Sequence, residues 1–255
     1  MKFRDMCNMF KKMRVEEIAP ENNLESIWFN SDMPVLAQLP EGFHSAAIVF
    51  HPILKMPDEW HVVKSHDGTI EYPNDDEELK YGIPMKWSYI MKHCGFTEYR
   101  EMCIALQTRI GALNDKYKRD DLYEKLATYI DENERLFYPD EDNAPIGMIK
   151  ELLSILQLEG AKQFTRVEEI YSEMNGEYRF DDFDNVRRIP RFFKEAFIYS
   201  EDKRFAFLGV YDAFFTVFMS SEHEINSVLK QFDIEGFECT EDTTISWHIK
   251  NSEHH

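Results

Sequence analysis

Cysteine is scarce in this chain of 255 residues. Its cysteines are scattered, and no two of them have the C-x-x-C spacing of redox and zinc motifs. This distribution argues against a disulfide-stabilised fold and against a structural zinc site, and it indicates reduced thiols in a cytoplasmic protein. The four cysteines are Cys7, Cys94, Cys103 and Cys239.

Glycine is also scarce, with ten residues in the whole chain. The patterns G-x-x-x-x-G-K-[ST], G-x-G-x-x-G and G-x-S-x-G are all missing. These motifs mark phosphate-binding loops, dinucleotide-binding folds and serine hydrolases. The sequence therefore gives no support to those three classes of protein.

Long apolar runs are missing as well. The closest candidate, residues 205–219, is shorter than the ~20 residues of a membrane-spanning helix and contains Asp212. The N-terminus lacks the apolar segment and cleavage site of a secretory signal. We expect no membrane span and a cytoplasmic location. His254 and His255 could belong to a purification tag, so they enter no argument about ligands.

Positive charge is in deficit, because 29 Lys and Arg residues stand against 48 Asp and Glu residues, a net charge of -19. Such a field repels nucleic acid and attracts a cationic partner. We therefore expect no nucleic-acid ligand and consider a basic protein as the partner. The alternative is that the acidity only keeps the protein soluble.

The hydrophobic pattern predicts an α+β protein of 255 residues that forms a single domain. An N-terminal region of strands and loops precedes a central helical layer, and a C-terminal antiparallel ββ(β)αβ unit follows. Candidate subdomains are residues 1–176 and 177–255. The connecting segment at 177–194 is too aromatic for a freely flexible linker.

The individual elements are predicted from apolar periodicity and from turn residues. In the first two regions these are an amphipathic helix near 3–13, a strand at 46–50, a hairpin of 60–64 with 69–72, an exposed acidic loop at 74–78, and helices at 85–94, 97–113, 120–130, 145–158 and 166–174.

The C-terminal unit is predicted as a hairpin at 196–211, a third strand at 213–219 and a helix. A capping box of Ser221 and Glu224 begins this helix. The final stretch EGFECTEDTTISWHI, residues 235–249, alternates between apolar and polar residues. That period predicts a half-buried strand, or two strands split by a turn around residues 241–244. In both cases Cys239 and Trp247 face the core and His248 faces water.

The densest group of candidate metal ligands consists of His44, His51, His61, His66 and Asp67. Neutral imidazoles and a carboxylate are ligands that zinc and other divalent metals prefer. The spacings match no motif such as H-E-x-x-H. We retain His51, His61, His66 and Asp67 as candidate metal ligands, and predict no other cofactor.

Two acidic segments resemble each other, YPNDDE at 72–77 and YPDEDN at 138–143. Neither has the residue order of a calcium-binding EF-hand loop. Both are predicted to be solvated loops that could dock together on a basic partner. The candidate partner-binding residues are Asp75, Asp76, Glu77, Asp140, Glu141 and Asp142.

Two further groups were weighed for chemistry. Cys94 follows His93, but neighbouring residues on a helix point about 100° apart, so this pair does not form a nucleophile and its base. Arg187, Arg188 and Arg191 form a basic patch that either pairs with internal carboxylates or binds an anion.

The hairpin, the third strand, the helix SSEHEINSVLKQF and the stretch IEGFECTEDTTISW resemble the C-terminal part of uncharacterised Gram-positive bacterial families. The arrangement is similar in style to small acidic immunity proteins. The resemblance covers about the last quarter of the chain and implies no activity.

Three hypotheses about function follow. The first is a protein-interaction module, immunity-like, that binds a basic partner. The second is a metal-dependent hydrolase that uses the histidine-rich segment at 44–67. The third is a structural or accessory role.

Overall fold

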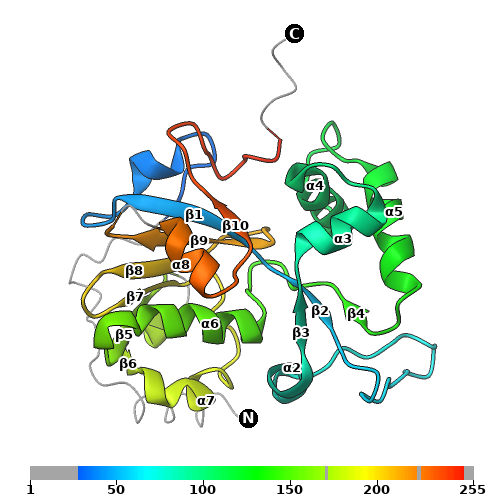
Figure 1. The fold of residues 1–255 in the computed structure, drawn as a ribbon, viewed down its shortest axis with the longest axis horizontal. Coiled ribbons are helices and arrows are strands. Elements are labelled where there is room, and N and C mark those ends of the chain that lie inside the picture. Colours follow the sequence, from blue (N-terminus) through cyan, green and yellow to red (C-terminus); the bar gives the residue numbers. More distant parts are fainter. Residues whose placement is uncertain (1–27, 170–171, 223–224, 250–255) are drawn as a thin grey trace.

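A computed structural model describes residues 28–169, 172–222 and 225–249, and it shows an α+β fold with two antiparallel sheets (Figure 1). The predicted fold class is confirmed. The large sheet has the order β10-β1-β9-β8-β7-β5-β6, and the small sheet has the order β3-β2-β4.

The elements have the following bounds. The strands are β1 (Ser45–Phe50), β2 (Ile53–Lys55), β3 (Ile83–Met85), β4 (Leu136–Phe137), β5 (Gln163–Val167), β6 (Gly176–Arg179), β7 (Phe197–Ser200), β8 (Phe205–Gly209), β9 (Phe215–Ser220) and β10 (Gly236–Glu238). The α-helices are α2 (Asp75–Tyr81), α3 (Trp87–Cys94), α4 (Tyr99–Ile110), α5 (Asp120–Asp131), α6 (Ile146–Leu156), α7 (Phe183–Val186) and α8 (Ile225–Gln231). Short 3-10 helices lie at Val35–Gln38, Leu158–Gly160, Ser172–Met174 and Phe180–Asp182.

Strand β1 lies inside the large sheet, between β9 and β10, and all six of its residues are buried. Successive side chains of a strand point to opposite faces. Ile48 and Phe50 accordingly join the core on one face, and Ala47 and Val49 join the core on the other. A continuous apolar run is what a strand covered on both faces requires.

The chain continues from β1 into β2 and so connects two lobes (Figure 1). We call the large sheet with α6, α7 and α8 the large-sheet lobe, and the small sheet with α2, α3, α4 and α5 the small-sheet lobe. Residues of β1, β9 and the helices α3 to α5 belong to one buried cluster. The two lobes therefore share a core.

Several predicted elements are confirmed, because their apolar patterns are unambiguous. These are the strand at 46–50, the hairpin and third strand that became β7, β8 and β9, and the helices that became α3, α4, α5, α6 and α8. Gly95 ends α3 in the left-handed conformation, as expected of a C-terminal cap.

The helix predicted at 166–174 is wrong, because residues 163–167 form strand β5 between β6 and β7. Arg166 is fully buried in this strand. Its guanidinium donates to the Phe192 carbonyl at 2.6 Å and to Asn175 Oδ1 at 3.1 Å, and Glu168 lies 3.4 Å away. These partners satisfy the buried charge of Arg166.

Of two further predictions between residues 60 and 81, one is confirmed in shortened form and the other is wrong. The hairpin of 60–64 with 69–72 has a single antiparallel bridge between Lys64 and Ile70, and the Glu71 N–H donates to the Val63 carbonyl at 2.9 Å. The acidic loop at 74–78 is instead the start of α2. Asn74 caps this helix and accepts from the Asp76 and Glu77 N–H groups at 3.1 Å, and acidic side chains stabilise a first helical turn.

The strand predicted at 235–249 is present only at Gly236–Glu238. The prediction that His248 faces water is also wrong. After Cys239 the chain turns, and N–H groups donate three residues back, from Trp247 to Thr244 at 3.0 Å and from Ile249 to Ser246 at 3.0 Å. This tighter period buries His248, which is 5% exposed, and leaves Trp247 only partly buried.

The large sheet takes strands from both sides of residue 176, since β5 pairs with β7, and β1 pairs with β9 and β10. The division into candidate subdomains at that residue stays a prediction. The helix predicted near 3–13 and the Glu224 half of the capping box lie outside the described residues. No helix in the described part of the chain is long and apolar enough to cross a membrane.

Gly236 lies where β10 comes closest to β1. A Cβ atom at this position would overlap the Ile48 carbonyl oxygen and lie 3.1 Å from Val49 Cα. We expect Gly236→Ala to lower the free energy of unfolding by about 1–3 kcal/mol, because the strands would have to separate. Urea unfolding measures this change. Gly147→Ala is the control, since its Cβ meets no atom within 4 Å, and an equal loss in both variants would contradict the prediction.

Candidate functional site

The structure does not bring the candidate metal ligands together. His51 is fully buried at the end of β1, with Nε2 3.0 Å from the Thr216 hydroxyl, and burial lowers its pKa to about 3. His61 and His66 are exposed in the loop that follows β2. Asp67 is also exposed and accepts from the Ser65 hydroxyl and the Thr69 N–H, which is ordinary turn chemistry.

Within the described ranges, no group of three or more His, Cys, Asp or Glu side chains is arranged to hold a metal ion. His44 is likewise exposed, ahead of β1. The hydrolase hypothesis therefore gains no support from the geometry. Among the described residues, Cys94 and Cys239 offer no reactive thiol, because burial raises the pKa of Cys94 to about 11 and of Cys239 to about 12.

Three of the six candidate partner-binding acids are already used inside the fold. Asp76 pairs with Arg187 at 2.5 Å. Glu77 closes the capping box of α2 by accepting from the Asn74 N–H at 3.0 Å. Asp142 is buried, and it pairs with Lys194 at 3.0 Å.

The other three acids, Asp75, Asp140 and Glu141, are exposed. Within the described part of the chain, none of them has an ion-pair partner within 4 Å. Asp75 and Asp140 line a cavity of about 380 Å³ together with Tyr72 and Tyr138. The two acidic segments that resemble each other in sequence thus line the same space, which we call the acidic cavity.

Arg187 and Arg191 of the predicted basic patch also line the acidic cavity. The Arg187 guanidinium is 2.5 Å from Asp76 and 3.3 Å from Asp184. Its charge is therefore neutralised by two carboxylates, and the interpretation of this patch as an internal ion-pair network holds for Arg187.

Glu78 is the site residue that sequence reasoning missed. It lies on α2 and its Oε1 accepts from the Gly147 N–H, 3.2 Å away in the first turn of α6. Burial, with a smaller contribution from the charges of Asp75 and Asp140, raises its pKa to about 7, while the Gly147 N–H acts in the opposite direction. A carboxyl group of this kind exchanges its proton near neutral pH.

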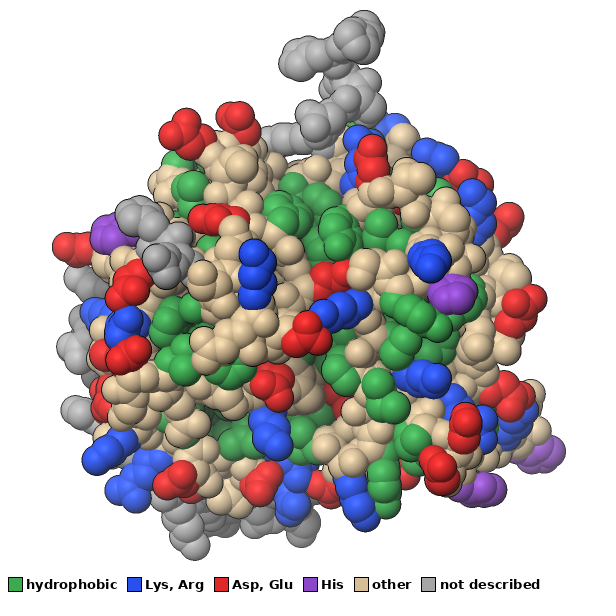
Figure 2. Space-filling view, in the orientation of Figure 1, with side chains coloured by type: hydrophobic (Ala, Val, Ile, Leu, Met, Phe, Trp, Pro, Cys, Tyr) green, Lys and Arg blue, Asp and Glu red, His purple; other side chains and the backbone are tan. Residues whose placement is uncertain are grey.

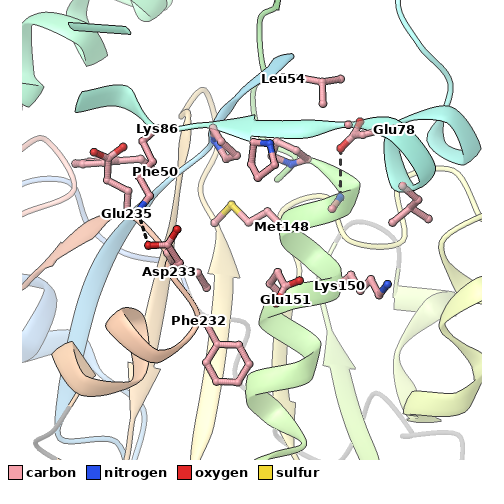
Figure 3. A pocket seen from close by; sticks show the side chains of 17 residues that line it. Phe50, Leu54, Glu78, Lys86, Met148, Lys150, Glu151, Phe232, Asp233 and Glu235 are labelled. Atoms are coloured by element: carbon pink, nitrogen blue, oxygen red, sulfur yellow. Dashed lines mark hydrogen bonds and ion pairs between the residues drawn. The ribbon is translucent and has the colours of Figure 1, made fainter. Parts of the chain in front are cut away.

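A second cavity, of about 260 Å³, lies on another side of Glu78, between the two lobes (Figure 3). We call it the interlobe pocket. Figure 3 shows Met148 of α6 reaching toward β3, and Phe232 of the α8 end below it. Leu54, Glu78 and Pro145 line both this pocket and the acidic cavity.

Polar contacts join the lobes at the rim of the interlobe pocket. The Lys86 ammonium is 2.5 Å from the Asp233 carboxylate. Glu235 accepts from the Trp87 N–H, from the Ser88 N–H at 3.0 Å and from the Tyr99 hydroxyl at 3.1 Å. Because Lys86 offers no side-chain cap, Glu235 supplies the N-terminal cap of α3 from the other lobe.

We expect Glu235→Ala to lower the free energy of unfolding by about 1–2 kcal/mol, since it removes a charged cap from the positive end of α3. Thermal and urea unfolding measure this loss. Asp233→Asn serves as the control, because it breaks only an exposed ion pair, worth about 0–1 kcal/mol, and asparagine tolerates the positive φ of this position. A larger loss in the Asp233 variant would mean that Glu235 is not the cap.

Comparison with known proteins places the chain in a family. It belongs to the family described as Protein of unknown function (DUF2711), which matches residues 31–249 and so includes both lobes and both cavities. It is 34% identical over 226 residues to Uncharacterized protein YwbB of Bacillus subtilis (strain 168), covering 88% of this chain and 99% of that protein. No solved structure gives a significant match. The expected membership in an uncharacterised Gram-positive family is confirmed.

Proposed function

We propose that this protein is an interaction module that binds a basic partner, with a lysine or arginine side chain of the partner entering the acidic cavity. The observation that carries the proposal is the convergence of Asp75 and Asp140, which come from two separate segments and have no ion-pair partner among the described residues. Two unpaired carboxylates at one cavity form a site of negative potential.

The aromatic side chains of the cavity support a cationic ligand. Tyr72 is 52% exposed, so a face of its ring is available to a guanidinium or an ammonium group. Tyr138 already has Arg109 over its ring, 4.1 Å from the centroid. We therefore assign the cation of the partner to the side of the cavity formed by Tyr72 and Asp75.

The net charge of the whole protein also favours a basic partner. A net charge of -19 speeds the approach of a basic partner and orients it. Figure 2 shows acidic and basic side chains interspersed on the face toward the viewer, so specificity has to come from a local site. The similarity in style to small acidic immunity proteins also favours this class of function.

We also propose a cytoplasmic location for this interaction. Cys94, Cys103 and Cys239 are free and buried, as reduced thiols of a cytoplasmic protein are.

The test is a capture experiment with three immobilised proteins. The wild type is compared with two variants. The cavity variant is Asp75→Asn/Asp140→Asn/Glu141→Gln. The control variant, Glu41→Gln/Glu124→Gln/Glu132→Gln, has the same change in net charge at exposed acids elsewhere. A basic protein captured from bacterial extract should bind the cavity variant at least about tenfold more weakly, a loss of 1.4 kcal/mol.

The control variant should bind that protein nearly as well as the wild type. Equal weakening in both variants would show that only the net charge matters. Unchanged capture by the cavity variant would remove the acidic cavity from the interaction.

A further inference from the structure

We propose that the interlobe pocket binds a small organic ammonium ion, whose apolar part packs against Phe50, Met148 and Phe232 and whose nitrogen meets the Glu78 carboxylate. This site is separate from the surface that binds the basic partner, although Glu78 borders both. The proposal adds a small-molecule ligand to a protein otherwise treated as an interaction module.

The size and the walls of the pocket define the apolar part of the ligand. The volume of about 260 Å³ lies just below the ~300–1,000 Å³ of pockets for drug-sized ligands, so the ligand is small. Phe50, Met148 and Phe232 contribute apolar surface from the large-sheet lobe, and Leu54, Leu79 and Pro84 contribute it from the small-sheet lobe. Such walls favour a short alkyl or aryl group over a polar one.

The charges of the lining define the other part of the ligand. Four acids line the pocket, Glu78, Glu151, Asp233 and Glu235, against the two bases Lys86 and Lys150. Lys86 is paired with Asp233, and Lys150 points away from the centre of the pocket (Figure 3). The lining thus favours a cation and disfavours an anion.

Glu78 is the carboxyl group placed to meet that cation. Glu235 accepts from two N–H groups of α3 and from the Tyr99 hydroxyl, whereas, among the described residues, Glu78 accepts only from backbone N–H groups at the start of α6, those of Gly147 at 3.2 Å and of Ile146. Because its pKa is raised to about 7, this carboxyl group exists in both its protonated and its ionised form near neutral pH. A bound ammonium ion would favour the ionised carboxylate, so binding would release that proton.

Isothermal titration calorimetry at pH 7, in two buffers with different ionisation enthalpies, tests the proposal. The probes are phenethylammonium, cyclohexylammonium and hexylammonium, with 2-phenylethanol as the neutral analogue and phenylacetate as the anion. At least one amine should bind with net proton release, at least tenfold more tightly than the alcohol, and phenylacetate should not bind.

Two variants locate the binding. Glu78→Gln keeps an oxygen for the Gly147 N–H, and it should abolish proton release and weaken amine binding at least tenfold. Gly147→Leu places a side chain on α6 where a Cβ meets no atom within 4 Å, so it should fold and block the pocket. Overturning results are no binding of any of the three amines, equal affinity for 2-phenylethanol, or unchanged affinity in Gly147→Leu.

The same variants separate this proposal from the proposed function. The cavity variant with Asp75, Asp140 and Glu141 neutralised should keep amine binding within threefold, because those side chains do not line the interlobe pocket. Gly147→Leu should keep the capture of a basic partner. Loss of only one of the two activities therefore identifies which site has been assigned wrongly.

Discussion

Replacing Trp87 by alanine is expected to lower the free energy of unfolding by about 3–5 kcal/mol, because it removes a large buried side chain and leaves a cavity. Trp87 is fully buried at the start of α3, and its ring stacks on Phe50 with the centroids 4.3 Å apart and the planes at 4°. Its indole N–H donates to the His51 carbonyl at 2.7 Å. Urea unfolding followed by circular dichroism measures the loss.

Trp28→Ala is the matched control, since Trp28 is 56% exposed and its indole N–H donates to Glu169 at 3.0 Å. It should cost about 1 kcal/mol or less. Comparable losses in the two variants would contradict the assignment of Trp87 to the core between the lobes. Because the lobes share that core, Trp87→Ala should also unfold in a single transition.

The fold class was predictable where the apolar pattern had one interpretation. The run SAAIVF can only be a strand with both faces covered, and it became β1. Strand β5 was missed because its buried Arg166 depends on Phe192 and Asn175, whose positions no local pattern contains. Tertiary contacts, rather than propensity, decided that segment.

The acidic cavity was predictable only in part. The similarity of the segments at 72–77 and 138–143 was visible in the sequence, and both segments line one cavity. The separate roles of their acids were not predictable, because Asp76 is neutralised by Arg187, a residue 111 positions away. Glu78 was missed for the same reason, since its burial depends on α6.

The C-terminal stretch shows how alternation can mislead. Residues 237–249 alternate as a strand does, yet only Gly236–Glu238 pairs with β1. The Thr240 N–H donates to the Thr243 hydroxyl at 2.9 Å, and this local bond competes with further pairing. His248 becomes buried as a result, and burial lowers its pKa to about 4.

Acid should destabilise this protein through His51 and, with the same sign, through His248. The shift of the pKa is larger for His51. Its pKa is 6.5 in the unfolded chain and about 3 in the folded protein, because burial disfavours the charged ring. Between these values the unfolded state binds a proton that the folded state does not. The free energy of unfolding therefore falls as the pH falls below about 6.5, and it levels off near pH 3, after a loss on the order of 3–5 kcal/mol.

Glu78 has the opposite effect, because its pKa of about 7 in the folded protein exceeds its ordinary value of 4.5. Its protonation therefore stabilises the fold as the pH falls through that range. A single pH profile would combine the contributions of His51, His248 and Glu78, and His51→Gln isolates that of His51. Glutamine can still form a hydrogen bond with the Thr216 hydroxyl but does not titrate. Between pH 6.5 and 5, the free energy of unfolding of this variant should therefore fall by about 2 kcal/mol less than that of the wild type. Urea unfolding at several pH values measures how the free energy of unfolding depends on pH in the wild type and in His51→Gln. His61→Gln is the control, because His61 is exposed and its replacement should keep the wild-type slope. An unchanged slope in His51→Gln would mean that His51 is protonated inside the folded protein, and that its burial against Thr216 is not what keeps the ring neutral.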